Sequence, residues 1–164
     1  MTNYSVPLRY IPKKLNKKDT KKIKRELNLS RKMYKKGKYY TRKKVKSFKS
    51  TTSNHIINAR KIYKIQNIKP SNELVKKTGC SINALKKIVS KGEGAYFSSG
   101  SRPNQTPQSW GYARLASSIT GGKASAVDFK ILEEGCNNNS KALKLAKKSP
   151  YFKHGSKRVP NIRL

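Results

Sequence analysis

The chain has 164 residues, of which 40 are Lys or Arg and seven are Asp or Glu, so its formal net charge is +33. Such an excess of one sign opposes compaction unless a polyanion neutralises it, and nucleic acid is the obvious polyanion. No apolar run approaches the roughly 18 residues of a membrane span, and the N-terminus lacks the apolar stretch of a secretory signal. We therefore expect no membrane partner and no secretion.

The positive charge is distributed unevenly. Residues 1–70 carry 23 basic and two acidic side chains, residues 71–140 carry nine and five, and residues 141–164 carry eight and none. A chain this basic at both ends has little apolar surface there to bury. The sequence therefore predicts that the compact part lies in the middle of the chain.

Most apolar side chains after Tyr63 lie between Leu74 and Leu132, and they recur at helical spacing. We predict a mainly α fold, in which a small helical core with a helix-turn-helix-like hairpin is flanked by extended or helical Lys-rich arms. The predicted parts are a basic N-terminal arm or helical region over 1–69, a compact helical core over 70–136 and a basic C-terminal tail over 137–164.

Two elements are predicted at the N-terminus. Residues 1–15 read as extended, because two prolines disfavour helix and apolar residues alternate there. A helix is expected over about 17–36, with Asn16 as its N-cap and Gly37 as its C-terminal stop. The helix has one thin apolar stripe, so it must dock on other parts of the chain or on nucleic acid.

Residues 38–50 interleave aromatic and cationic side chains. Tyr39, Tyr40 and Phe48 could stack on bases while the lysines meet phosphates. Alternatively, the segment is a solvated basic linker whose aromatic residues pack locally. A short helix over about 54–66 follows. The nucleic-acid-binding residues predicted in this region are Lys35, Lys36, Lys38, Tyr39, Tyr40, Arg42, Lys43, Lys44 and Lys46.

The clearest supersecondary pattern spans residues 71–92. Ser71 caps one short helix, Gly79 supplies a left-handed stop, and Ser81 caps a second helix. The spacing is similar to a helix-turn-helix, in which Leu85 and Ile88 would be core positions and Lys86 and Lys87 would face outward to nucleic acid. A simple helical hairpin within a core explains the same pattern.

Residues 92–106 have the composition of an ordered loop, and a helix is expected over about 107–120, capped by Thr106. A third helix is expected over about 124–134, with Asp128 near its first turn, and a weak helix over 141–148. The loop before the 107–120 helix could bind an anion through Ser99, Ser101, Arg102 and Thr106. Alternatively, Arg102 is a structural clamp that pairs with Asp128, with Glu93 or with backbone carbonyls.

Residues suited to catalysis or metal binding are scarce. Cys80 and Cys136 lie far apart, neither is part of a CxxC pair, and His55 and His154 are not at ligand spacing. We expect two reduced thiols, as in a reducing compartment, with a single disulfide as the alternative. The seven carboxylates form no recognisable acid–base pair. We therefore predict no enzyme activity, no catalytic residue, no metal and no cofactor.

Two segments are distinctive: residues 91–123, KGEGAYFSSGSRPNQTPQSWGYARLASSITGGK, and residues 36–48, KGKYYTRKKVKSF. With these segments the chain resembles an uncharacterised family of basic proteins, a domain of unknown function, encoded by large double-stranded DNA viruses and related phages. The resemblance covers most of the chain, but it brings no established activity and no site residue. It implies a viral context with a large DNA genome.

The charge of the arms, the interleaved tyrosines and the lack of catalytic groups favour a non-catalytic virion or genome-associated protein. It would bind nucleic acid, expected to be DNA, mainly through phosphates. One alternative is a minor capsid or scaffold protein, whose arms thread between subunits and meet acidic viral structural proteins. Another is a sequence-specific helix-turn-helix regulator. We expect the protein in the virion or inside the host cell, in the nucleus or a cytoplasmic virus factory.

Overall fold

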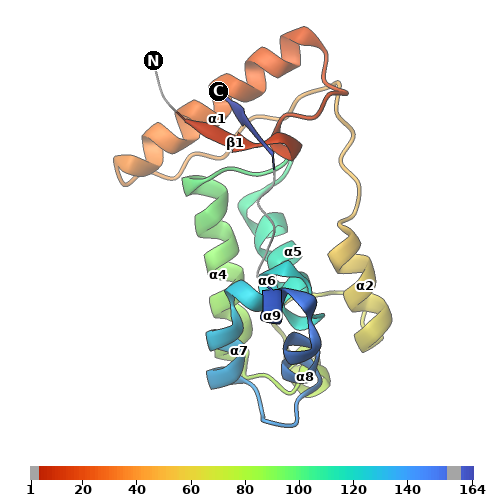
Figure 1. Cartoon of the computed structure of the whole chain (residues 1–164). Coiled ribbons are helices and arrows are strands. Elements are labelled where there is room, and N and C mark those ends of the chain that lie inside the picture. Colours follow the sequence, from red (N-terminus) through yellow and green to blue (C-terminus); the bar gives the residue numbers. More distant parts are fainter. Residues whose placement is uncertain (1–3, 155–159) are drawn as a thin grey trace. The chain divides into compact units, whose positions relative to one another are not determined.

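The computed structural model describes residues 4–154 and 160–164, and it confirms the mainly α fold that the sequence predicts (Figure 1). Among these residues, no helix is both long and apolar enough to cross a membrane. The elements are β1 (Ser5–Pro7), a 3-10 turn (Leu8–Tyr10), α1 (Lys17–Lys35), α2 (Asn54–Tyr63), α3 (Asn72–Thr78), α4 (Ile82–Ser98), α5 (Pro107–Ile119), α6 (Lys123–Val127), α7 (Phe129–Gly135), α8 (Lys141–Lys148), α9 (Pro150–His154) and β2 (Asn161–Arg163).

The chain forms two compact units, each assembled from segments that are distant in sequence. Unit 1 comprises the described residues of 1–51, 93–110 and 158–164, and unit 2 comprises those of 52–92 and 111–157. This division differs from the three parts predicted from charge. It differs because the two chain ends pair with each other in unit 1, and because α8 packs into the core of unit 2.

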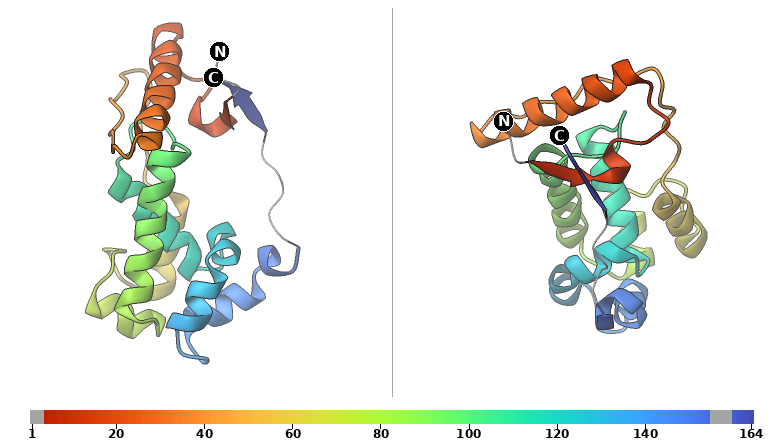
Figure 2. Two further views of the ribbon diagram at one scale, coloured as in Figure 1. Left: turned by 90° about the vertical axis from the view of Figure 1, so that its left-hand side faces the viewer. Right: turned by 45° about the horizontal axis from the view of Figure 1, so that its top comes forward.

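Unit 1 is built on the apolar stripe of α1. The Asn16 side chain caps this helix by accepting the backbone N–H of Asp19, and the chain leaves it through Gly37 at φ 73°, both as predicted. β1 pairs antiparallel with β2, which lies beside it (Figure 2). The core of unit 1 consists of Val6, Tyr10, Ile11, Leu15, Ile23, Leu27 and Val45, with Tyr4, Phe48, Trp110, Ile162 and Leu164 packed against it.

The α3–α4 hairpin of unit 2 has the caps that the sequence predicts. Ser71 Oγ accepts the N–H of Leu74, Gly79 adopts φ 77°, and Ser81 Oγ accepts the N–H of Ala84. The predicted core positions, Leu85 and Ile88, are fully buried, and the predicted outward positions, Lys86 and Lys87, are exposed. These features are common to a helix-turn-helix and to a structural hairpin.

Helix α4 is longer than predicted, so the expectation of a loop from residue 92 onward is wrong for residues 92–98. One of the glycines that suggested a loop, Gly92, has another explanation. A Cβ at Gly92 would lie 2.6 Å from the Cα of Gly111, so Gly92 permits two backbones of unit 2 to approach closely. The helix also continues far enough to bury Tyr96 completely.

The predicted third helix is also wrong, because Asp128 divides it into α6 and α7. Asp128 is 1% exposed, and its carboxylate accepts hydrogen bonds from Arg114 Nε at 3.0 Å, Arg114 Nη2 at 2.7 Å and Ser118 Oγ at 2.8 Å. This inward ion pair satisfies a buried charge and interrupts the helix. It also removes Asp128 as a partner for Arg102.

Part of the predicted C-terminal tail belongs to the core of unit 2. The weak helix expected over 141–148 is present as α8, with Ser140 as its cap. Its residues Ala142, Leu143 and Ala146 are at most 1% exposed. Residues 155–159 of the predicted tail lie outside the described residues.

Cys80 and Cys136 form a disulfide, so the prediction of two reduced thiols is wrong. Two backbone hydrogen bonds hold the segments of the two cysteines side by side. The N–H of Ser81 donates to the carbonyl of Gly135 at 2.7 Å, and the N–H of Asn137 donates to the carbonyl of Gly79 at 2.9 Å. The bond joins residues 56 positions apart, and only the tertiary pairing of these two short segments reveals it.

Removal of the disulfide is expected to destabilise unit 2. In the Cys80→Ser/Cys136→Ser variant the free energy of unfolding should fall by about 2–4 kcal/mol, because the unfolded chain regains loop entropy. Urea unfolding with and without reductant measures this effect. The reduced wild type should match the variant, and two reactive thiols in unreduced, denatured wild type would contradict the bond.

Two glycines of α4 offer a matched pair of substitutions. Gly92→Ala should destabilise the protein by about 1–3 kcal/mol, because the new Cβ meets the backbone of Gly111. Gly94→Ala should stabilise it by about 0.5–1 kcal/mol, because a Cβ there meets nothing within 4 Å and alanine favours helix. Thermal unfolding distinguishes them, and effects of equal sign would contradict the helical packing described here.

Candidate nucleic-acid interface

Residues 40–48, here called the anchored segment, are extended but belong to no sheet. Their backbone groups are bound by side chains instead. On the α1 side, Glu26 Oε2 accepts the N–H of Lys43 at 3.0 Å and Asp19 Oδ2 accepts the N–H of Ser47 at 2.8 Å. A polar backbone near a core needs such partners to remain ordered. The carboxylates of α1 therefore hold the anchored segment in place.

Asn104 binds the same segment from the loop between α4 and α5. Its Oδ1 accepts the N–H of Val45 at 2.8 Å, and its Nδ2 donates to the carbonyls of Val45 at 3.1 Å and Phe48 at 2.7 Å. Asn104 itself adopts the left-handed conformation, with φ 63°, which asparagine tolerates better than most residues. The segment is thus ordered from two sides by side chains that the sequence analysis did not single out.

Both negatively charged side chains of the N-terminal region accept hydrogen bonds in this arrangement. Residues 1–51 contain 19 Lys or Arg residues and two carboxylates, Asp19 and Glu26. Both carboxylates are buried, and hydrogen bonds from Ser47 hold the pKa of Asp19 below its usual value. Glu26 also accepts the hydroxyl of Tyr40 at 2.9 Å. Two carboxylates cannot balance 19 basic side chains, so most of the lysines of this region remain without an anionic partner within it.

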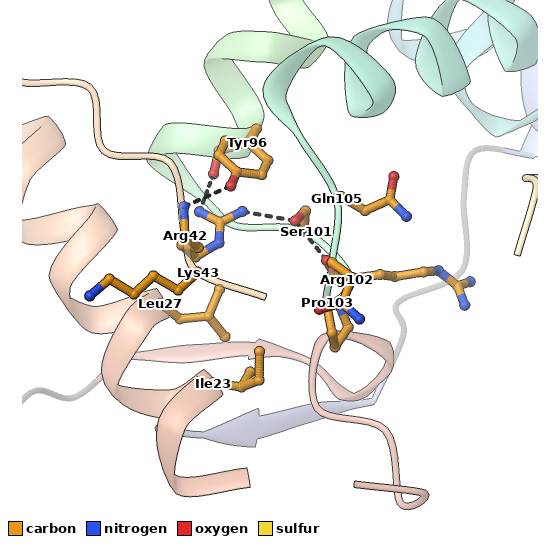
Figure 3. A pocket seen from close by; sticks show the side chains of 10 residues that line it. Ile23, Leu27, Arg42, Lys43, Tyr96, Ser101, Arg102, Pro103 and Gln105 are labelled. Carbon is orange, nitrogen blue, oxygen red and sulfur yellow. Dashed lines mark hydrogen bonds between the residues drawn. The ribbon is translucent and has the colours of Figure 1, made fainter. Parts of the chain in front are cut away.

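Among the predicted binding residues, Arg42 is buried and not exposed, which contradicts a role in binding. It is 9% exposed, and burial lowers the pKa of its guanidinium. Its Nη1 donates to Ser30 Oγ at 2.8 Å. Figure 3 shows two further bonds of the guanidinium, from Nη1 to the Tyr96 carbonyl at 2.7 Å and from Nη2 to Ser101 Oγ at 2.8 Å. The guanidinium also lies 3.7 Å from the centre of the Tyr96 ring. Arg42 is a structural residue of unit 1 and has no free face for a phosphate.

The aromatic residues of this region have different environments. Tyr40 is bound to Glu26, and Phe48 packs against the core of unit 1. Tyr39 instead is 75% exposed. Its ring lies 5.0 Å from that of Phe97 and 6.4 Å from that of Tyr34, measured between ring centres. Of the three predicted stacking residues, Tyr39 is therefore the exposed one, while Tyr40 and Phe48 are partly buried.

The lysines that the sequence predicts remain at the surface. Those of unit 1 are Lys35, Lys36, Lys38, Lys43, Lys44 and Lys46, and those of unit 2 are Lys86 and Lys87 on α4. The lysines that follow Arg42 are held on an ordered backbone. In unit 1, the predicted lysines therefore lie at the end of α1, in the turn that follows it and on the anchored segment.

The structure adds a groove that the sequence analysis missed. It has a volume of about 540 Å³ and is lined by Tyr4, Arg25, Asn28, Leu29, Arg31, Lys32 and Lys35. Arg31 lies 3.6 Å from the centre of the Tyr4 ring. The spacing of positions 25, 28, 29, 32 and 35 could have revealed this face, because these positions share one side of a helix.

The four predicted anion-binding residues do not converge on one site. Ser101 is buried, accepts a hydrogen bond from Arg42 and donates one to the Arg102 carbonyl. Thr106 Oγ1 accepts the N–H of Ser109 and so caps α5, as predicted. Ser99 is exposed, and its carbonyl accepts the hydroxyl of Tyr4. Of the four, Arg102 alone presents a charged side chain to solvent, and it points away from Arg42 (Figure 3).

The pocket beside Arg42 is too small for a nucleotide. Its volume is about 10 Å³, which is room for a single water molecule. In the described part of the chain, no group of three or more His, Cys, Asp or Glu side chains is placed to hold a metal ion. The surface lysines, the α1 groove and the exposed tyrosine are therefore the features that can bind a partner.

Residues 7–139 match the model of a family of unknown function (DUF5824), and the chain belongs to this family. The match spans most of the chain and includes the whole of α1, the anchored segment and α4. Membership of an uncharacterised family is thus confirmed, whereas the viral origin expected from the sequence stays a prediction. No curated protein and no solved structure matches the chain.

Arg42 and its neighbour Lys43 provide a direct test of the structural assignment. Arg42→Met should lower the free energy of unfolding by about 3 kcal/mol or more, because buried polar partners would lose their charged donor. Lys43→Met should change it by less than about 0.5 kcal/mol, because that side chain is exposed. Urea unfolding measures both. Unchanged stability of Arg42→Met, with weakened DNA binding, would restore Arg42 as a binding residue.

Proposed function

We propose that this member of the DUF5824 family binds nucleic acid without catalysis, mainly through contacts between its lysines and phosphates. The observation that carries the proposal is the imbalance of charge in residues 1–51, which hold 19 Lys or Arg side chains against two carboxylates, Asp19 and Glu26, that bind the anchored segment. Phosphates can supply the missing negative charge, and they release condensed counterions when a lysine neutralises them.

The order of the anchored segment supports the same proposal. Lys43, Lys44 and Lys46 project from a backbone that Glu26 and Asn104 hold in place. A flexible arm would lose conformational freedom when it binds, whereas this segment has already lost it on folding. The lysines therefore need to order only their own side chains when they meet a phosphate.

The viral context implied by the sequence resemblance extends the proposal to a particular setting. The nucleic acid would be the DNA of a large virus, and the protein would accompany it in the virion, in the host nucleus or in a cytoplasmic virus factory. The competing role, a minor capsid or scaffold protein, would direct the same lysines to acidic protein surfaces.

A second candidate function is favoured by the α3–α4 hairpin. Its turn glycine, buried Leu85 and Ile88, and exposed Lys86 and Lys87 have the arrangement of a helix-turn-helix. A sequence-specific regulator would use these lysines near base edges. Substitution of Lys86 and Lys87 would then change the preference among DNA sequences, whereas under the leading proposal it lowers affinity equally for all of them.

The proposal predicts a steep dependence of DNA affinity on salt. If about six phosphates or more are neutralised, the affinity for a duplex of arbitrary sequence should fall by about 10³-fold or more between roughly 50 and 200 mM salt. Fluorescence anisotropy with a labelled duplex measures the slope. Replacing Lys43, Lys44 and Lys46 by Gln should reduce that slope by about two to three, at about 0.9 for each phosphate that the variant no longer neutralises.

A matched control has the same change of charge in unit 2. Lys144, Lys147 and Lys148 are exposed on α8. Replacing these three lysines by Gln should leave the slope of DNA affinity against salt nearly unchanged. A salt-independent affinity, or binding to acidic protein but not to DNA at low salt, would reject the proposal and favour the capsid role.

A further inference from the structure

The ring of Tyr39 requires an explanation that phosphate binding does not provide. It is the most exposed of the large hydrophobic side chains in the described residues, at 75%. A tyrosine ring that is largely exposed on an ordered backbone offers an apolar face to a partner, and tyrosine is enriched at interfaces. Phosphates need cations and not aromatic rings. The exposure of Tyr39 therefore indicates a second kind of contact.

The Tyr39 ring is held in position by a series of aromatic contacts that begins in the core. Phe97 lies 5.0 Å from Tyr39 and 5.2 Å from Tyr96, between ring centres, and Tyr96 is fully buried beneath the guanidinium of Arg42. Tyr34, at the end of α1, lies near the ring as well. We call Tyr34, Tyr39 and Phe97 the aromatic platform.

The backbone before Tyr39 is also well defined. The amide groups of Lys36 and Lys38 donate to the carbonyl of Met33, and that of Gly37 donates to the carbonyl of Tyr34. This turn ends α1 and places Tyr39 two residues after the left-handed glycine. The ring therefore projects from a fixed turn and packs against Phe97 and Tyr34, and most of its surface remains open to a planar group.

The charges around the platform indicate what that group is. Lys35, Lys36 and Lys38 surround it in sequence and are all exposed. Lys35 also lines the α1 groove together with Arg25 and Lys32, so cations continue from the platform along the helix. Aromatic rings beside a cationic track bind single-stranded nucleic acid, whose bases stack while its phosphates meet lysines.

We propose, resting on the phosphate binding proposed above, that unit 1 binds single-stranded DNA and stacks an unpaired base on the aromatic platform. A duplex offers the same phosphates but keeps its base faces inside the helical stack. The platform thus distinguishes single strands from duplexes without reading the sequence, because every base has a face that can stack.

Three labelled probes test this inference with the full-length protein: a 20-nucleotide oligo(dT), the same length of abasic sugar-phosphate chain, and a 20-base-pair duplex. The wild type should bind oligo(dT) more tightly than the abasic chain. Tyr39→Leu should weaken oligo(dT) binding by about 5-fold to 100-fold, which is the range for the loss of one stacked base. The abasic chain and the duplex should bind this variant within about twofold of the wild type.

Two further variants complete the design. Tyr39→Phe retains a ring and should restore oligo(dT) binding. Tyr151→Leu changes an exposed tyrosine of unit 2 and should leave all three affinities unchanged. Because Tyr39 is exposed, its replacement should leave the thermal unfolding temperature nearly unchanged, and this measurement separates a loss of stacking from a loss of folding.

The outcomes distinguish this inference from the function on which it rests. Equal losses on all three probes, no loss on any, or wild-type preference for the duplex would overturn base stacking while the phosphate proposal stands. If the wild type ignores all three probes at low salt, the phosphate proposal itself fails.

Discussion

The structure of unit 1 depends on one constraint, which is that an extended lysine-rich segment without a partner strand must find other partners for its backbone. Asp19, Glu26 and Asn104 provide these partners through hydrogen bonds to residues 43–48. Two of the three are carboxylates, and they are the negatively charged side chains of residues 1–51. The two anions of this region therefore order the segment, and the lysines around them greatly outnumber them.

Unit 2 follows a related pattern on a different scaffold. Asp128 is buried between α6 and α7, where Arg114 and Ser118 bind it. A carboxylate that accepts several hydrogen bonds tolerates burial in its charged form, whereas a lysine can keep its ammonium in water at the end of a flexible stem. A chain with a net charge of +33 thus folds with several of its few anions inside and with most of its lysines at the surface.

Under the two proposals, these charges and the aromatic platform serve the same partner, a single-stranded nucleic acid. The lysines of the anchored segment and of α1 match a row of phosphates, and the exposed Tyr39 ring matches the face of an unpaired base. Neither feature forms a catalytic site, and the pocket beside Arg42 holds no more than a water molecule. The two proposals are independent in their chemistry, since one depends on charge and the other on the accessibility of base faces.

The sequence by itself determined the helical class, the caps at Asn16, Ser71 and Thr106, and the stop at Gly79, because caps and left-handed turns are local and depend on the residues nearest to them. It also located the basic residues. Only the tertiary structure decided which binding candidates are available: Arg42 is buried in unit 1 and Tyr40 is bound to Glu26, whereas Tyr39 is exposed. The disulfide, the continuation of α4 through Gly92 and the break at Asp128 depend likewise on partners far away in sequence, which no local pattern specifies.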